Sequence, residues 1–451
     1  MKKLAVVAVF SAAMLAANAA MAQNAALEKQ VDSVYPQAKA LYEDIHEHPE
    51  LSAHETRTAA EMAEKLRALG YDVTEHVGGT GVVAILKNGP GPTVMLRTEL
   101  DALPVEEKTG LPYASKVRTK NDAGVEVPVM HACGHDMHMS SLWGTAAIMA
   151  RTRDTWNGTL MLIGQPAEET VGGARGMVAD GLFTRFPKPD VGVALHSSNA
   201  LPAGQVGITP EYALSNSDAI RITVYGRGGH GAAPESTIDP IVIGASIVMR
   251  LQTIVAREIH PGDPAVITVG SFQAGTKNNI IPDHAVLLLT VRSYKKEVRE
   301  HLLKAIQRIA EGEAQAAGAE KMPQVEDYES TDAVYNDPVL AQHLLPVLES
   351  VVGKGNAKVM GSWMASEDYS AFIEAGVPSF FYSLGAADPE KWKEAKAGGA
   401  PLPSNHSPYY APVEDPSLKV GIATEVALLR DLLKGTPADV RKFTEQKSGG
   451  N

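Results

Sequence analysis

The chain has 451 residues, a formal net charge of −12 at pH 7 and a single cysteine, Cys133. This length exceeds what one small core requires and favours two domains. The acidic balance, without long runs of either sign, argues against a nucleic-acid partner, which requires clustered Lys and Arg. One cysteine cannot form a disulfide within the chain, so in an oxidising compartment its thiol needs burial or a metal.

The N-terminus has the pattern of a signal peptide. Lys2 and Lys3 precede an apolar run over residues 4–15, and Ala20-Met21-Ala22 supplies a small-x-small cleavage signal. The run is shorter than the roughly 20 residues that span a bilayer. We therefore predict a signal peptide over residues 1–22 and a periplasmic or secreted protein, with a retained N-terminal helix as the alternative. Cleavage would change the net charge from −12 to −14, because two lysines and no acids leave. No later apolar stretch is expected to span a membrane.

Apolar strands and amphipathic helices alternate over residues 25–211 and again over residues 330–435. The expected helices cover residues 27–47 and 52–69, and the expected strands cover residues 81–86, 93–97, 159–163 and 191–195. Continuous apolar runs between amphipathic helices are typical of buried strands in an α/β sheet. We predict that both stretches form one α/β domain.

Residues 212–329 have a different order of elements and are predicted to form an inserted domain. The expected strands cover residues 220–225, 265–269, 285–291 and 324–328, and the expected helices cover residues 239–257 and 295–316. The order β-α-β-β-α-β is that of a small ferredoxin-like domain with one open sheet face. The tail, residues 436–451, is expected to be disordered.

Residues 131–138 bring one thiol and three imidazoles into eight positions. Cys133, His131, His135 and His138 lie in this block, directly before a helix-like run. Thiolate and imidazole are ligands for zinc-like ions, so the block predicts a metal site. The alternative is a helix start with incidental histidines.

Further candidate side chains follow other strands. Glu168 and Glu169 end one apolar strand, and two neighbouring carboxylates suit metal ligation and proton transfer, although a solvated loop is the simpler interpretation. His196 closes another strand, and His406 lies in a polar loop. Taken together, these residues fall at the sheet rim where α/β proteins bind ligands.

The ordered motifs of the chain resemble those of the metal-dependent aminoacylase/carboxypeptidase family. The nearest branch contains hippurate hydrolases, N-acyl-amino-acid amidohydrolases and auxin–amino-acid conjugate hydrolases. The resemblance runs from about His46 to Leu433. It is carried by residues 46–52, 96–104, 131–136, 166–169, 228–234, 279–282, 366–368 and 405–408.

The resemblance implies a metallopeptidase-like α/β catalytic domain with a central mixed sheet, and an inserted ferredoxin-like α+β lid and dimerisation domain. It also implies two divalent metal ions per chain, with zinc, manganese, nickel and cobalt as candidates. Cys133 would bridge the ions. The remaining ligands would be His135, Glu169, His196 and His406.

The implied activity is hydrolysis of the amide bond of N-acyl amino acids, or of similar amides with a free carboxylate. A metal-bound hydroxide would attack, with Glu168 as general base and acid. His230 would stabilise the oxyanion, and Asn279 and Arg292 would hold the substrate carboxylate. Asp101 would fix a ligand imidazole.

His131 and His138 fit the family block but are expected to be structural. Relatives usually have aspartate where this chain has Glu99, which puts the shape of the pocket in doubt. The expected partner is a small N-acyl amino acid or short peptide. The chain is expected to form a homodimer through the inserted domain, with His230 reaching the partner's site. Two alternatives stay open: a carboxypeptidase or dipeptidase, and a non-catalytic periplasmic binding protein.

Overall fold

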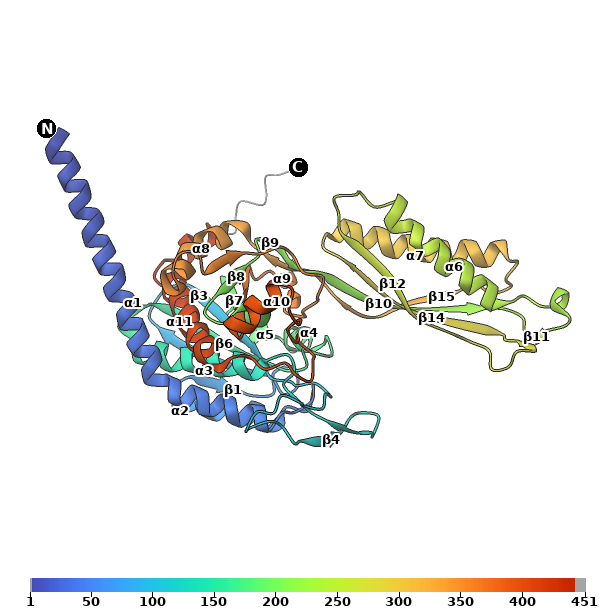
Figure 1. Ribbon diagram of the computed structural model, residues 1–451, viewed down its shortest axis with the longest axis horizontal. Coiled ribbons are helices and arrows are strands. Elements are labelled where there is room, and N and C mark those ends of the chain that lie inside the picture. Colours follow the sequence, from blue (N-terminus) through green and yellow to red (C-terminus); the bar gives the residue numbers. More distant parts are fainter. Residues whose placement is uncertain (1, 443–451) are drawn as a thin grey trace. The chain divides into compact units, whose positions relative to one another are not determined.

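The computed structural model describes residues 2–442, with side chains described for residue 22, residues 24–440 and residue 442 (Figure 1). The chain forms two compact units. The large unit contains Met1–Glu211, Tyr335–Gly361 and Phe372–Asn451, and the small unit contains Tyr212–Val334 and Ser362–Ala371.

The large unit is built on one eight-stranded sheet with the order β1-β2-β6-β3-β7-β18-β8-β17. Its strands are β1 (Asp72–Thr74), β2 (Val82–Asn88), β3 (Thr93–Glu99), β6 (Gly158–Gln165), β7 (Val191–Pro202), β8 (Val206–Ile208), β17 (Ala357–Val359) and β18 (Ser379–Ala387). Strands β6, β3, β7 and β18 run parallel, whereas β2 pairs antiparallel with β6 and β8 pairs antiparallel with β18. The predicted α/β fold with a central mixed sheet is confirmed.

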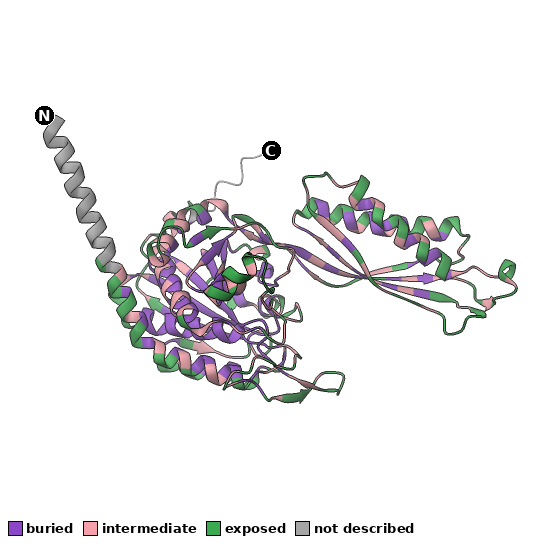
Figure 2. Cartoon of the chain, viewed as in Figure 1, coloured by how far each residue is buried: buried purple, intermediate pink, exposed green. Residues whose placement is uncertain are grey.

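Helices cover this sheet. They are α1 (Lys2–Glu47), α2 (Thr56–Ala68), α3 (His135–Arg151), α4 (Gly173–Ala179), α5 (Leu182–Arg185), α8 (Pro338–Val352), α9 (Ser370–Glu374), α10 (Pro389–Lys396), α11 (Glu414–Leu432) and α12 (Pro437–Arg441). Helix α3 contacts both α1 and α11, and it is buried from His135 to Met149. The core of the large unit therefore lies on both sides of α3 and against the central strands (Figure 2).

Short elements complete the chain. They are β4 (Arg118–Lys120), β5 (Glu126–Pro128), β9 (Glu211–Leu214), β16 (Val334–Asn336), and two 3₁₀ turns at Arg153–Thr155 and Pro234–Ser236.

Both predicted terminal segments contain helical residues. Helix α1 continues through the predicted cleavage point after Ala22, and apart from Ala22 the side chains of the predicted signal peptide lie outside the described residues. Cleavage therefore stays a prediction. At the other end, the prediction of disorder from residue 436 is wrong for α12, because the side chains of Thr436 and Asp439 form a capping box that starts this helix. Residues 443–451 lie outside the described part of the chain.

The small unit is a four-stranded antiparallel sheet with two helices. The strands, in the order β12-β14-β10-β15, are β10 (Asn216–Tyr225), β12 (Ala265–Ala274), β14 (His284–Ser293) and β15 (Gln324–Thr331). Helices α6 (Pro240–Arg257) and α7 (Lys296–Ala316) share one core with alternate residues of the sheet. A short ladder of β11 (Gly229–His230) and β13 (Ile280–Ile281) lies beyond one end of the sheet (Figure 1).

A return segment, Ser362–Ala371, also belongs to the small unit, although the sequence assigned it to the large domain. The backbone N–H of Trp363 donates to the carbonyl of Ala213 (3.0 Å), and the N–H of Ser215 donates to the carbonyl of Ala365 (2.9 Å). Backbone bonds of this kind depend on no side-chain pattern and therefore cannot be predicted from the sequence.

By length and composition alone, helix α6 could cross a membrane. This differs from the expectation that no segment after the N-terminal one would be long and apolar enough to do so. Ile247 and Leu251 point into the core of the small unit, which explains part of this apolar character. Val242 and Met249 are instead 64% and 72% exposed. Because β12 forms an edge of the sheet and contacts α6, an apolar helix face lies beside a sheet edge.

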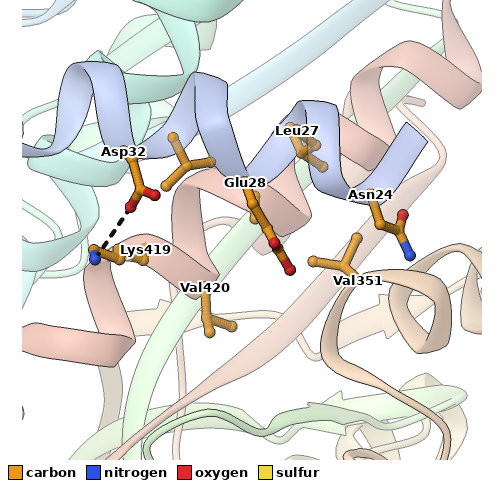
Figure 3. Close-up of a pocket in the computed structure, with 9 residues that line it drawn as sticks. Asn24, Leu27, Glu28, Asp32, Val351, Lys419 and Val420 are labelled. Atoms are coloured by element: carbon orange, nitrogen blue, oxygen red, sulfur yellow. Dashed lines mark ion pairs between the residues drawn. The ribbon is translucent and has the colours of Figure 1, made fainter. Parts of the chain in front are cut away.

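A surface pocket of about 280 Å³ lies between α1, α8 and α11 of the large unit (Figure 3). Its lining residues are Asn24, Leu27, Glu28, Val31, Asp32, Val351, Lys419, Val420 and Ala423. Lys419 forms an ion pair with Asp32 across it (3.2 Å). None of the predicted site residues lines this pocket.

Candidate active site

The five predicted metal ligands come together at the rim of the large unit's sheet. Ligand atoms of Cys133, His135 and His196 lie within 4.8 Å of one another, and those of Cys133, Glu169 and His406 form a second such group. Cys133 belongs to both groups. The two groups thus describe two adjacent sites that share one sulfur atom.

The distances between individual atoms agree with this grouping. Cys133 Sγ lies 3.4 Å from His196 Nε2, and His406 Nε2 lies 3.3 Å from Glu169 Oε2. His135 Nε2 lies 4.0 Å from Glu169 Oε1 and 3.9 Å from Glu168 Oε2. The Nε2 atoms of all three histidines therefore face one space.

The opposite ring nitrogens explain why Nε2 is the free atom. His135 Nδ1 donates to the backbone carbonyl of Asp101 (2.8 Å), and His196 Nδ1 donates to the carbonyl of Ser197 (2.9 Å). A neutral imidazole that donates from Nδ1 presents a lone pair at Nε2, which is the form that binds a metal.

Asp101 is held directly behind His135. Its carboxylate accepts from Ser52 Oγ (2.6 Å) and from the backbone N–H of Glu169 (3.0 Å), and lies 3.4 Å from His135 Nδ1. Burial alone would raise the pKa of Asp101, but the hydrogen bonds from His135, Ser52 and the N–H of Glu169 lower it. The carboxylate thus stays ionised beside the imidazole that it was predicted to orient.

The chemistry of the cluster fits a divalent cation. Among the described residues, His135 Nε2 and Glu169 Oε1 are buried and have no hydrogen-bond partner, which is costly unless another group satisfies them. Burial raises the pKa of Cys133, and the charges of Glu169 and Glu168 raise it further. A bound cation would counteract this rise in the pKa of Cys133 and favour its thiolate form. The sulfur and nitrogen donors suit zinc-like ions.

His138 uses both ring nitrogens within the protein. The backbone N–H of Ser197 donates to its Nε2 (2.8 Å), so its Nδ1 donates to Glu99 Oε2 (2.9 Å). Burial lowers the pKa of His138 to about 4, and that of the buried His131 to about 4 as well. His138 therefore has no free lone pair in this arrangement, in line with the structural role expected for it.

Glu99, the unusual acid of this chain, lies in the same network. Its second carboxylate oxygen pairs with Arg97, whose Nε donates to Gln165 Oε1 (2.8 Å). Burial would raise the pKa of Glu99, but the charge of Arg97 and the hydrogen bond from His138 lower it well below its ordinary value. Glu99 is thus a buried carboxylate held between an arginine and an imidazole.

Glu168 follows a strained turn. Ala167 has a φ of +49°, which non-glycine residues rarely adopt, and its N–H donates to Glu55 Oε1 (2.8 Å). The turn carries Glu168 and Glu169 into the same space, where a Glu168 oxygen borders His135. Both carboxylates are thereby available to one reaction centre.

The comparisons with known proteins identify the family. Residues 95–430 match the sequence model of peptidase family M20/M25/M40. The chain belongs to this family. It is 38% identical to the hippurate hydrolase of Campylobacter jejuni over 332 residues, which are 73% of this chain and 83% of that protein. It is 36% identical to thermostable carboxypeptidase 1 of Saccharolobus solfataricus over 389 residues, which are 85% of this chain and 92% of that protein.

A solved structure supports the same assignment. The crystal structure of the Bacillus subtilis YXEP protein, described as a dinuclear metal-binding peptidase of the M20 family, has a TM-score of 0.72 and 28% identity. The alignment covers 89% of this chain and 99% of that protein. The chain is accordingly a metal-dependent amidohydrolase of the M20 type.

The site includes two residues to which the sequence assigned no role, although one of them, Asn405, belongs to a motif that carries the family resemblance. Ser197 Oγ accepts from Tyr410 OH (3.0 Å) and lies 3.0 Å from His138 Nε2, and Asn405 Nδ2 donates to the carbonyl of Cys133 (3.1 Å). Ser197 follows a predicted ligand and Asn405 precedes one. Their places beside ligands were the available signal, but only the tertiary contacts assign them partners.

A second buried network supports the start of α3. His46 Nδ1 lies 2.6 Å from Asp136 Oδ2, and His46 Nε2 lies 3.0 Å from Glu107 Oε1. Burial would lower the pKa of His46, but the two carboxylates raise it to about 10. An imidazolium thus ties the end of α1 to the residue that follows His135.

Three predicted residues of the M20 chain lie in the small unit. His230 and Asn279 are exposed and adjacent, because the N–H of Gly231 donates to the carbonyl of Asn279 (2.9 Å). Arg292 is half-buried in β14, where its Nη1 donates to the carbonyl of Met364 (2.8 Å).

The sheet register separates these residues within one chain. His284, at the end near β13, pairs with Tyr225, whereas Arg292 pairs with Ser217 at the opposite end. The eight residue-to-residue steps from 284 to 292 correspond to about 27 Å of extended strand. Strand β14 therefore places Asn279 and Arg292 at opposite ends of the small unit, and their joint hold on the substrate carboxylate stays a prediction.

Proposed function

We propose that this M20 amidohydrolase cleaves the amide bond of N-acyl amino acids, or of similar amides that carry a free carboxylate. The observation that carries the proposal is the cluster in which Cys133 is common to two ligand groups and a Glu168 oxygen lies 3.9 Å from His135 Nε2. Relatives named hippurate hydrolase and N-acyl-L-amino acid amidohydrolase support this substrate class. The carboxypeptidases among the relatives make short peptides the second candidate.

The proposed cofactor is a pair of divalent ions. Cys133 would contact both, with His135 and His196 in one group and Glu169 and His406 in the other. When bound, such ions polarise a carbonyl and lower the pKa of water. Zinc, manganese, nickel and cobalt are the candidates, and thiolate ligation favours zinc among them.

Glu168 is the proposed proton carrier. Its carboxylate lies 3.9 Å from His135 Nε2, and it has Glu169 as its neighbour in the chain. It would take the proton of the attacking water and deliver it to the departing amine. A non-catalytic binding protein would have no use for a carboxylate in this position.

Arg292 is the proposed anchor for the substrate carboxylate. Its guanidinium is half-buried, and burial lowers its pKa. Among the described residues no carboxylate pairs with it, and its contact is the carbonyl of Met364. A partly desolvated guanidinium without an anion suits a bidentate bond to an incoming carboxylate.

The separation within the small unit supports a homodimer. If His230 and Arg292 serve one substrate, they must come from two copies, because about 27 Å of strand separates their ends of one small unit. We propose that the exposed face of α6, with Val242 and Met249, and the edge of β12 form the contact between copies. His230 and Asn279 of one copy would then complete the site of the other.

Export is the last part of the proposal. Residues 1–22 are proposed to be a signal peptide that directs the chain to the periplasm. N-terminal sequencing of the protein from a periplasmic fraction should begin at Gln23. A protein that retains Lys2 and Lys3 would contradict export by this route.

The proposed activity is tested by metal reconstitution followed by a substrate panel. The purified chain, stripped by chelation, is reloaded separately with zinc, manganese, nickel or cobalt. Each form is assayed with benzoyl, acetyl, indolyl and fatty-acyl amino acids and with matched dipeptides. Cleavage of the acyl amino acids only after metal return supports the proposal. Preferential cleavage of dipeptides would favour the peptidase alternative, and full activity of chelated enzyme would refute both.

A further inference from the structure

Three ligands of the proposed centre come from separate segments. Cys133 lies in the turn before α3, His196 lies in β7, and His406 lies in the loop between α10 and α11. The loop is irregular, and His406 itself has a φ of +70° in the left-handed region. Because loops lack the internal ladders of strands and helices, their side chains need other bonds to hold a fixed position.

Asn405 supplies bonds to both of the other segments. Its Nδ2 donates to the carbonyl of Cys133 (3.1 Å) and lies 3.3 Å from the carbonyl of Ser197, the residue after His196. The same nitrogen lies 3.9 Å from Cys133 Sγ. The side-chain amide of Asn405 therefore contacts the ligand Cys133 and the residue that follows the ligand His196. Asn405 is also joined through the backbone to the ligand His406.

We infer that Asn405 is a positioning residue of the metal centre, which fixes Cys133, His196 and His406 relative to one another and directs an N–H group at the ligand sulfur. The inference rests on the proposed function, because it concerns the same ligands. The amide of Asn405 carries two N–H groups, and its nitrogen lies near two carbonyl oxygens and the sulfur of Cys133.

The chemistry of an amide suits this place better than a carboxylate of the same shape. Aspartate at position 405 would direct oxygen lone pairs at the carbonyls of Cys133 and Ser197 and place a charge beside a thiolate. An alanine would remove the bonds without adding repulsion. The two substitutions therefore separate loss of donation from added repulsion.

Other bonds keep the loop in place when Asn405 is changed. The N–H of His406 donates to the carbonyl of Ala132 (2.8 Å), and the N–H of Lys108 donates to the carbonyl of Pro408 (2.8 Å). We therefore expect Asn405→Ala to fold and to alter the ligand geometry.

Asn199 provides a matched control. Its Nδ2 donates to the carbonyl of Pro403 (2.8 Å), so it ties the same loop to β7, but no contact of its side chain with Cys133 is described. Asn199→Ala removes an anchor of the loop and leaves the group beside the sulfur unchanged.

The test is cobalt binding by the chelated full-length protein under anaerobic, reducing conditions. Titration gives the affinity, and the sulfur-to-cobalt charge-transfer band reports the environment of the thiolate. In Asn405→Ala, cobalt affinity should fall about 10–100-fold, as for other groups that orient ligands. The band should move to longer wavelength, since a thiolate that loses a hydrogen-bond donor gives up charge more readily. Asn405→Asp should bind at least as poorly, and Asn199→Ala should keep the wild-type band.

Three results would overturn the inference. Asn405→Ala with wild-type affinity and spectrum would remove its role, and equal changes in the Asn405 and Asn199 variants would reduce it to a loop anchor. Failure of the wild-type chain to bind cobalt would overturn the proposed centre together with the inference. Thermal unfolding of each variant separates loss of binding from loss of folding. If Asn405→Ala does not fold, the isosteric Asn405→Asp carries the same measurement.

Discussion

Glu425 is a buried carboxyl group whose replacement by glutamine should stabilise the protein at alkaline pH. It lies on α11, fully covered, and its Oε2 accepts from Ser141 Oγ (2.9 Å) and Thr145 Oγ1 (2.7 Å) of α3. Burial raises its pKa from 4.5 to about 8, even though these hydroxyl bonds act in the opposite direction. The folded protein therefore holds a neutral carboxylic acid at this position at neutral pH.

The sign of the pH dependence follows from linkage. The folded state binds the Glu425 proton more tightly than the unfolded state does, so its contribution to stability is fully present below pH 4.5. That contribution falls as the pH rises towards about 8 and is lost above it. At about 1.4 kcal/mol per pH unit, this interval corresponds to at most about 5 kcal/mol.

Glutamine imitates the protonated form, since its Oε1 can accept both hydroxyl bonds and it never ionises. We expect Glu425→Gln to match the wild-type chain near pH 5 and to exceed its free energy of unfolding by about 2–5 kcal/mol near pH 9. Chelated wild-type and variant chains are compared by urea unfolding at both pH values. Glu394→Gln, which changes an exposed glutamate of α10, is the control. If the free energies of unfolding of Glu425→Gln and wild type differ by the same amount at pH 5 and at pH 9, the pKa of Glu425 is not raised.

Three further predictions concern activity. Glu168→Gln should lower turnover by about 10²–10⁴-fold and keep the metal, whereas Glu169→Gln should lose metal. Elemental analysis measures the metal content and steady-state kinetics the turnover of each variant. Equal metal content and equal turnover in the two variants would contradict the separate roles of Glu168 and Glu169. If Arg292 binds the substrate carboxylate, its replacement by a primary amide should lower kcat/KM by about 10²-fold or more. In the Arg292→Lys variant, the difference in kcat/KM between the acid and the amide substrate should be smaller. Mixed dimers of His230→Ala and Glu168→Gln chains should regain about a quarter of wild-type sites after random subunit exchange, because half the dimers are hybrids with one intact site. No recovery after exchange verified by mass would exclude action of His230 in the partner's site.

The sequence predicted the large sheet because apolar runs mark its strands, whereas the family resemblance supplied the candidate ligands. Apolar runs locate β2, β3, β6 and β7 to within a few residues, and polar residues at strand ends locate the site. Strand β7 nevertheless continues past its apolar run, through His196 to Pro202, because this part pairs with β18. Pairing with a neighbour, and not side-chain character, decides where that strand ends.

The residues that support the ligands could not be assigned in the same way. Glu99 was noticed as unusual, but its pairing with Arg97 and His138 depends on how β3 and α3 pack. Ser197 and Asn405 stand beside ligands in the sequence, but their bonds join segments about 200 residues apart. Contacts of this kind arise from the tertiary fold, for which a single sequence carries no periodic signal.

Asn279 and Arg292 show how an extended strand separates residues that are close in the chain. They are separated by 13 positions, and the family resemblance implied that both hold the substrate carboxylate. Most of those positions form the extended strand β14, and an extended strand converts each residue into about 3.4 Å of distance. Asn279 therefore groups with His230 at one end of the small unit, and Arg292 lies at the other. If His230, Asn279 and Arg292 act on one substrate, each complete site needs two copies of the chain. One copy supplies His230 and Asn279 and the other supplies Arg292, because β14 holds these residues at opposite ends of one small unit.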